Sequence, residues 1–123
     1  MKNGEFVLAK QLGSKGYYGR IRLAVEPTIS RMLTVDFQAG TEQQWRSGAE
    51  FGIVYGWELY HRGHPAVGGL QVRVLEIHSQ PVDTTNLVIA FVAANALWNA
   101  LEWLPTRLPT FDLKNGIFSF PKW

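Results

Sequence analysis

The residues most able to do chemistry lie in one short stretch, residues 10–27, KQLGSKGYYGRIRLAVEP. The stretch combines three glycines, two tyrosines and four cations, and it ends in the alternating pattern typical of a β-strand. Three structures fit this composition: a phosphate-binding loop, a finger that contacts nucleic acid, or a plain β-hairpin. A phosphate-binding loop needs a Gly-Lys-Ser/Thr ending and a following helix. A strand follows here, so we exclude a nucleotide site of that kind.

Basic and aromatic side chains are interleaved in this stretch, which favours contact with nucleic acid. Tyrosine rings can stack on unpaired bases while lysine and arginine side chains contact phosphates. An equally good interpretation is that one or both tyrosines anchor the loop onto the sheet. The RNA-binding candidates in this stretch are Lys15, Tyr17, Tyr18, Arg20 and Arg22.

The net charge of +2 is unevenly distributed along the chain. Residues 1–31 hold six cations and two acids, whereas the remaining residues hold six cations and eight acids. The basic N-terminal part hints at an acidic partner for the first hairpin. A solvated strand face would have the same composition, so this alternative stays open.

The three histidines are the other residues that could do chemistry. His61 and His64 lie at the predicted end of a helix and His78 ends the neighbouring strand, so the three rings could meet around a metal. No carboxylate has a matching spacing to them, and no strand-turn-helix serine motif accompanies them. We therefore expect no metal, no cofactor and no enzymatic activity.

The composition indicates one globular domain without disulfides. Of the 123 residues, 46% are hydrophobic and 18% are charged, which suits a domain with a hydrophobic core. The absence of cysteine excludes a disulfide framework and a thiolate zinc site. The most apolar run, residues 87–94, is too short to span a bilayer. We therefore expect a soluble, cytoplasmic protein with no membrane partner.

Four strands are predicted from alternating apolar residues. The clearest one places Ile21, Leu23 and Val25 on one face and Arg20 and Arg22 on the other. A flexible, glycine-rich loop over residues 11–19 is expected to join the first two strands. The predicted strands span residues 5–10, 20–26, 33–37 and 70–77.

The first predicted helix begins at Thr41 and runs to about residue 60. Thr41 and Gln44 match a capping box, in which each side chain bonds the backbone of the other residue. The helix contains three glycines spaced by four, and each costs about 1 kcal/mol against alanine in a helix interior. Close approach to the sheet or to the second helix is the expected compensation. The glycines are Gly48, Gly52 and Gly56.

A second helix and a C-terminal hairpin complete the predicted order. The helix should run from residue 85 to about residue 103, with Asp83 or Thr84 as its N-cap. Lys114-Asn115-Gly116 predicts a turn between two apolar segments, and the tail ends in Phe118, Phe120 and Trp123. The order β-β-β-α-β-α plus a hairpin is an α+β fold. We assign the main domain to residues 1–109 and the hairpin extension, packed on the same domain, to residues 110–123.

Short motifs along the chain form an ordered set. Tyr18-Gly19 and Glu26-Pro27 bracket the second strand, and Val82-Asp83-Thr84-Thr85 begins the second helix. The remaining members are Gly52-Ile53, Gly63-His64-Pro65 and Leu108-Pro109. In this order and spacing, over residues 6–109, the set resembles the fourth domain of elongation factor G.

This resemblance implies both a fold and the position of the functional surface. The implied fold is a split β-α-β sandwich with a left-handed crossover, an exception to the usual handedness of such connections. In that family the hairpin loop and the loop before the second helix form a tip that enters the ribosomal decoding centre. Carried over to this chain, the tip consists of residues 13–17 and 79–81. It adds Gln80 to the RNA-binding candidates.

The chain departs from the family pattern at three places. Gln80 stands where the family has a histidine, in a loop that is one residue shorter. Residues 38–41 replace a Gly-Gly and Ile-Pro stretch before the first helix, and these 123 residues contain no GTPase segment. The resemblance therefore implies a diverged, stand-alone domain that cannot itself drive translocation.

Together these observations predict a non-enzymatic domain that binds RNA or a ribosomal subunit through its basic hairpin. The alternative is a protein-interaction or structural domain that associates with itself or with another protein, without binding nucleic acid. An exposed apolar patch on the C-terminal tail would favour that alternative. A small-molecule enzyme of related fold is the third option, and no motif supports it.

Overall fold

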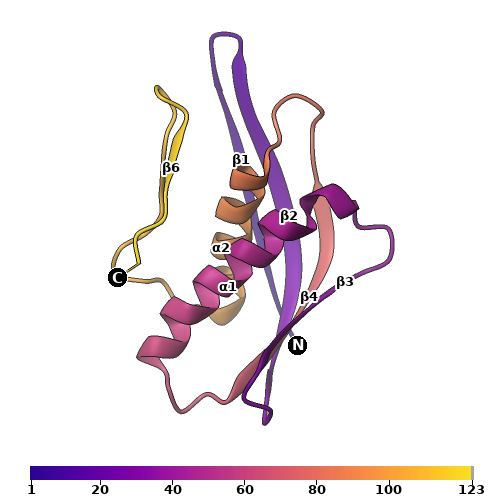
Figure 1. Cartoon of the computed structure of the whole chain (residues 1–123), viewed down its shortest axis with the longest axis vertical. Helices are drawn as coiled ribbons and strands as arrows, with labels where there is room; N and C mark the ends of the chain where they lie inside the picture. Colours follow the sequence, from indigo (N-terminus) through magenta and orange to yellow (C-terminus); the bar gives the residue numbers. More distant parts are fainter. Residues whose placement is uncertain (123) are drawn as a thin grey trace.

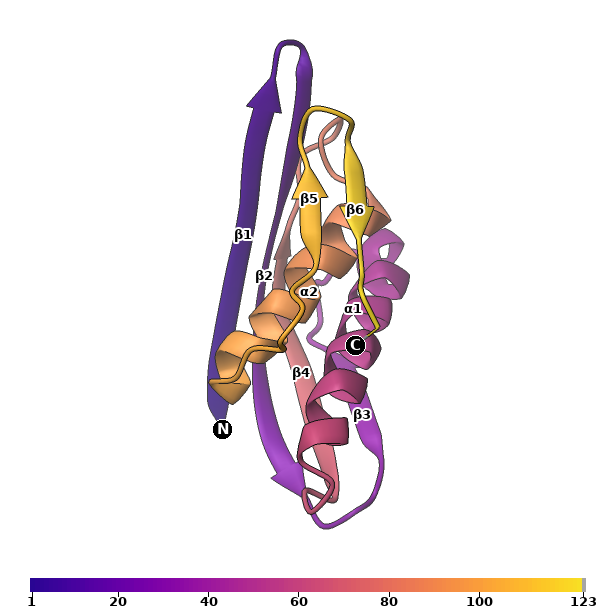
Figure 2. The ribbon, with the colours of Figure 1, turned by 90° about the vertical axis from the view of Figure 1, so that its left-hand side faces the viewer.

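The computed structural model describes residues 1–122 and consists of a four-stranded β-sheet with two helices packed on one face (Figures 1 and 2). A two-stranded hairpin lies against the helices, in front of them in Figure 2. This is the mixed α+β arrangement that the sequence predicts. The elements are β1 (Lys2–Leu12), β2 (Lys15–Thr28), β3 (Leu33–Phe37), a 3-10 turn (Gln43–Trp45), α1 (Arg46–Gly63), β4 (Gly69–His78), α2 (Asn86–Leu101), β5 (Thr110–Asp112) and β6 (Ile117–Ser119).

The strands of the main sheet lie in the order β1-β2-β4-β3. β2 is antiparallel to both β1 and β4, whereas β3 is parallel to β4 and is joined to it through α1. The predicted bounds of β3 are confirmed, and those of β4 are confirmed to within one residue at each end. α1 thus connects two parallel neighbouring strands, and β1 and β3 form the two edges of the sheet.

The prediction of a flexible loop over residues 11–19 was wrong. β1 and β2 pair without interruption from Lys2↔Val25 to Leu12↔Lys15, so only Gly13 and Ser14 remain between them. Gly13 has a φ of 61°, and glycine at the first of two central positions is typical of a type II′ turn, which matches the twist of antiparallel strands. The glycine-rich stretch therefore forms a long, regular hairpin.

The predicted start of the first helix was also wrong. The Thr41 hydroxyl donates to the Gln38 carbonyl, 2.7 Å away, and the Gln44 amide donates to the Glu42 carboxylate, so no capping box forms. A 3-10 turn comes first, and α1 begins at Arg46 without a side-chain cap. The local bonds of Thr41 and Gln44 compete with the helix for the same side chains.

The two helices approach each other along the predicted glycine stripe. A Cβ atom at Gly52 would lie 2.2 Å from the carbonyl oxygen of Ala90, and one at Gly48 would lie 2.7 Å from the Asn86 carbonyl oxygen. The Trp98 indole also donates to the Gly56 carbonyl across the same contact, at 3.2 Å. The expected compensation for these helix glycines is therefore confirmed, with α2 as the partner.

α2 is capped by Thr85, one residue later than predicted. The Thr85 side chain accepts a hydrogen bond from the Val88 amide at 3.2 Å. The helix ends at Leu101 because Glu102 adopts a left-handed conformation with a φ of 55°. Eleven of the sixteen residues of α2 are buried, so this helix forms the centre of the core. No helix within residues 1–122 is long and apolar enough to cross a membrane.

The core lies between the helices and one face of the sheet. The predicted alternation in β2 is confirmed, since Ile21, Leu23 and Val25 are at most 2% exposed and face the helices. The other face of the sheet carries polar side chains and no helix. The buried residues that the remaining strands of the sheet contribute to the core are Leu8, Leu70, Val72 and Val74.

The C-terminal hairpin forms at the predicted turn. Gly116 has a φ of 66° and donates to the Asp112 carbonyl, closing the loop between β5 and β6. The Phe118 ring packs on Phe91 of α2, with ring centroids 5.4 Å apart. Phe118 and Phe120 are half-buried rather than exposed. Trp123, the third member of the predicted apolar tail, lies outside the described residues.

Candidate functional site

The end of the β1–β2 hairpin projects beyond both helices and forms one extremity of the molecule (Figures 1 and 2). The loop between β4 and α2, residues 79–85, lies at the same end of the sheet. The two segments that the resemblance assigns to a tip are therefore neighbours. These segments include residues 13–17 and 79–81, which the resemblance assigns to a tip, and from here on the tip means residues 10–18 and 79–84.

The predicted RNA-binding residues of the hairpin fall on two faces of the sheet. Since side chains alternate along a strand, Tyr18, Arg20 and Arg22 lie on the face of the sheet opposite to the buried Ile21. We call this face, which no helix covers, the open face. Lys15 and Tyr17 lie on the helix side. The five candidates therefore do not form one continuous surface.

The two tyrosines have different environments. The Tyr17 ring is half-buried and packs edge-on against Phe111 of the C-terminal hairpin, with centroids 4.7 Å apart. Its hydroxyl lies so near Gly116 that a Cβ there would be 2.5 Å from it. Tyr18 is fixed through its backbone, and its ring lies on the open face. Tyr17 thus anchors the C-terminal hairpin, whereas the Tyr18 ring does not face the core.

Arg20 and Arg22 are both paired with carboxylates on the open face. The Arg20 guanidinium lies 2.8 Å from the Glu5 carboxylate, and Arg22 lies 2.9 Å from Glu76. The hydrogen bond and charge of Arg22 lower the pKa of Glu76, with a further contribution from His78 at 3.1 Å. These acids offset much of the positive charge that the sequence places on the strand.

Lys10 and Lys15 differ from the arginines. Both side chains are exposed near the turn, and neither forms an ion pair with any residue in the described part of the chain. They flank the turn on the helix side of the hairpin, beyond the end of α2. The uncompensated positive charge of the hairpin is therefore concentrated at its end.

The loop before α2 is fastened to β2 by backbone and side-chain bonds. The Tyr18 amide donates to the Asp83 carbonyl at 3.0 Å, and the Thr84 hydroxyl donates to the Tyr18 carbonyl at 2.7 Å. Gln80 is exposed, and its backbone amide donates to the Thr84 hydroxyl at 2.8 Å. Sequence reasoning missed Thr84, because adjacent threonines before a helix indicate only a cap.

The three histidines do not meet. His61 lies 2.8 Å from the Val67 carbonyl, and His64 lies 2.9 Å from the Tyr60 carbonyl, both near the end of α1. His78 ends β4 and lies beside Glu76. The ten residues of β4 span roughly 30 Å and separate His78 from the other two. Among residues 1–122, no group of three or more potential metal ligands is gathered at one place.

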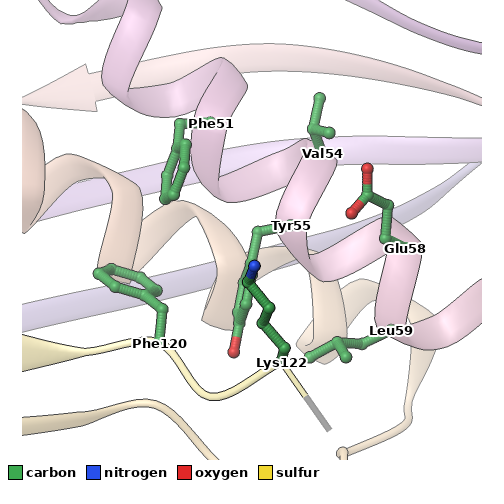
Figure 3. A pocket seen from close by; sticks show the side chains of 7 residues that line it. All are labelled: Phe51, Val54, Tyr55, Glu58, Leu59, Phe120 and Lys122. Carbon is green, nitrogen blue, oxygen red and sulfur yellow. The ribbon is translucent and has the colours of Figure 1, made fainter.

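A hollow of about 330 Å³ lies between α1 and the C-terminal tail (Figure 3). Phe51, Tyr55 and Phe120 form its aromatic walls, with Phe120 nearly perpendicular to the other two rings. The Tyr55 hydroxyl donates to the Pro121 carbonyl, and burial raises the pKa of Tyr55. Sequence patterns gave no sign of this hollow, because it forms only where the tail crosses α1.

Comparison with known proteins supports the fold. No protein-family model and no curated protein matches the chain. Among solved structures, the crystal structure of ttk003000868 from Thermus thermophilus is similar, with a TM-score of 0.60 and 24% sequence identity. The match covers 78% of this chain and 15% of the Thermus protein, so the chain corresponds to a small part of that protein's length. At this identity the likeness shows the α+β fold alone.

Proposed function

We propose that this chain forms a domain like the fourth domain of elongation factor G, which binds RNA or a ribosomal surface through its tip and catalyses no reaction. The proposal includes the split β-α-β sandwich with a left-handed crossover. Its structural support is the parallel pair β3 and β4 joined by α1, next to a long antiparallel hairpin. The ordered motifs of the sequence add to this support.

The observation that carries the proposal is the exposed basic end of the hairpin. The end of the hairpin projects beyond the helices. Lys10 and Lys15 are exposed near its turn, and no described carboxylate pairs with them. Uncompensated lysines on a projecting element can displace the counterions of a phosphate backbone, which makes binding favourable and dependent on salt. The tip also offers the groups needed for contacts with bases.

Each residue of the tip has a separate role in this proposal. Lys15 and Lys10 contact phosphates from the helix side of the hairpin, and the Tyr18 ring and the Gln80 amide contact bases from its opposite face. Arg20 and Arg22 are held by Glu5 and Glu76, so they support the strand and contribute less to binding. Tyr17 fixes the hairpin against Phe111.

The test is binding of the purified protein to ribosomal subunits and to short structured RNAs at two salt concentrations. Lys15→Ala should weaken binding and lower the slope of log K against log salt by about 0.7, the value for one phosphate of a single strand. Arg31→Ala is the matched control, because Arg31 is an exposed cation at the opposite end of the sheet. It should leave both quantities unchanged.

Two results would overturn the proposal. Absence of binding at the lower salt concentration would remove its basis altogether. Equal losses in Lys15→Ala and Arg31→Ala would show that net charge, and not the tip, drives association.

One observation favours the alternative of a protein-interaction domain. β1 is an 11-residue edge strand without proline, and Val7 on it is 48% exposed. Such an edge can pair with a strand of another chain. Light scattering at high salt distinguishes the two, since a dimer that persists there favours strand pairing over RNA binding.

A further inference from the structure

We propose that Thr84 is a positioning residue that joins the two segments of the tip into one surface for an unpaired RNA segment. This inference rests on the proposed function and adds a residue that the resemblance does not assign. The evidence lies in how one buried hydroxyl is shared between the two segments.

Thr84 is 6% exposed and is the buried polar side chain of the described core. Its hydroxyl accepts a hydrogen bond from the Gln80 amide at 2.8 Å and donates one to the Tyr18 carbonyl at 2.7 Å. A hydroxyl has one donor, and Thr84 uses it across the two segments while accepting within the loop. No other side chain described in residues 1–122 bonds both segments of the tip.

The backbone shows that the loop takes over the edge of β2 where β4 ends. β4 pairs with β2 as far as Arg20↔His78. Two residues earlier in β2, on the side of the turn, the Tyr18 amide donates to the Asp83 carbonyl instead. The Thr84 amide also donates to the Gln80 carbonyl at 3.2 Å. Thr84 therefore fixes both the internal shape of the loop and its docking on the strand.

Gly16 shows how closely the loop approaches the hairpin. A Cβ atom at this position would lie 2.5 Å from Oδ2 of Asp83. The three nearest atoms all belong to the Asp83 side chain, which would have to turn away from a Cβ at residue 16. Gly16→Ala therefore offers a second way to disturb the docking, from the hairpin side and without altering Thr84.

The consequence is that Gln80 and Tyr18 are held in a fixed relation before any RNA binds. The Gln80 amide and the Tyr18 carbonyl both bond the Thr84 hydroxyl. The Gln80 segment is therefore already in place when a base stacks on Tyr18. Fixing the two segments in advance lowers the entropy cost of binding. An unpaired segment is the expected ligand class, because only exposed bases can stack and bond at once.

The experiment compares Thr84→Val with Thr84→Ser and Thr85→Val. The valine variant keeps the shape and removes the hydroxyl, and the serine variant restores it. Thr85→Val is the matched control, because Thr85 caps α2 and does not bond the hairpin. Amide hydrogen exchange at Tyr18 and Gln80 and the affinity for a short unpaired RNA are measured for each variant, and for Gly16→Ala should Thr84→Val not fold.

Thr84→Val should accelerate exchange of the Gln80 amide and weaken RNA binding, each by about tenfold, as expected for the loss of a net hydrogen bond. Thr84→Ser should retain both properties, and Thr85→Val should leave RNA affinity unchanged.

Unchanged amide exchange in Thr84→Val would show that the Thr84 hydroxyl does not hold the two segments of the tip together. Faster exchange with unchanged affinity would overturn the positioning role. If the unaltered protein binds no RNA, the proposed function fails, and the positioning role fails with it. The exchange data would still decide whether the Thr84 hydroxyl holds the two segments of the tip together.

Discussion

The two halves of the β1–β2 hairpin differ in what covers them. The inner half, which is the half away from the turn, lies beneath α2. The approach is so close that a Cβ at Gly4 would lie 2.1 Å from the Ala96 carbonyl oxygen, and a Cβ at Gly19 would lie 2.7 Å from Val88. The outer half has no helix over it, and Lys10 and Lys15 are exposed there. The same two strands thus stabilise the fold at one end and are free to bind at the other.

The largest effect should come from truncating the same residue type in each half. Leu23 is fully buried in the inner half and Leu12 is 49% exposed in the outer half. Leu23→Ala should lower the free energy of unfolding by about 3 kcal/mol, through lost burial and the cavity left behind. Leu12→Ala should change it by less than about 0.5 kcal/mol. Urea unfolding of both variants measures the difference, and equal losses would contradict the division of the hairpin.

A smaller effect is expected from adding a single methyl group under α2. Gly4→Ala should destabilise the protein by about 2 kcal/mol, because the new Cβ meets backbone atoms of Ala96 and Ala100 that cannot rotate away. Asn3→Ala, at the exposed neighbouring position, should be nearly neutral. Thermal unfolding checks both variants. A neutral Gly4→Ala would mean that α2 can move off β1 without cost.

The smallest effect concerns the open face of the inner half. Arg22 lowers the pKa of Glu76, so the ion pair adds stability above the unfolded pKa of about 4.5, and this contribution is lost as the pH falls through the lower folded value. Glu76→Gln should therefore flatten the loss of thermal stability below about pH 4.5. Melting temperatures over a series of pH values measure this. Parallel pH profiles for the two proteins would exclude a contribution from the pair.

Periodicity predicted the inner half of the hairpin better than the outer half. Burial of alternate residues such as Ile21 and Leu23 follows from the strand pattern, because one face must meet the helices. The outer half has no such pattern, since no core lies beneath it. The spacing of the three glycines in this stretch did not show which one forms the turn. Only the register of β2 with β1 shows that residues 15–19 are paired.

The sequence predicted part of the candidate site, but neither Lys10 and Thr84 nor the arrangement of the site. Composition identified the basic hairpin, yet it could not show that Glu5 and Glu76 neutralise Arg20 and Arg22, because these pairs join residues on different strands. The role of Thr84 depends on a contact across 66 residues of sequence. Local propensity carries no information about such a contact.

Whether RNA binds at the tip can be tested by locating the RNA on the protein by NMR. A short unpaired RNA is titrated at low salt into the isotopically labelled protein, and the backbone amide shifts are followed. We expect the shifts to concentrate at residues 10–18 and 79–84, while residues 28–32 at the opposite end of the sheet stay unchanged. Shifts centred on residues 28–32 or on the hollow beside Phe51, or no shifts at all, would contradict the assignment of the tip as the binding surface.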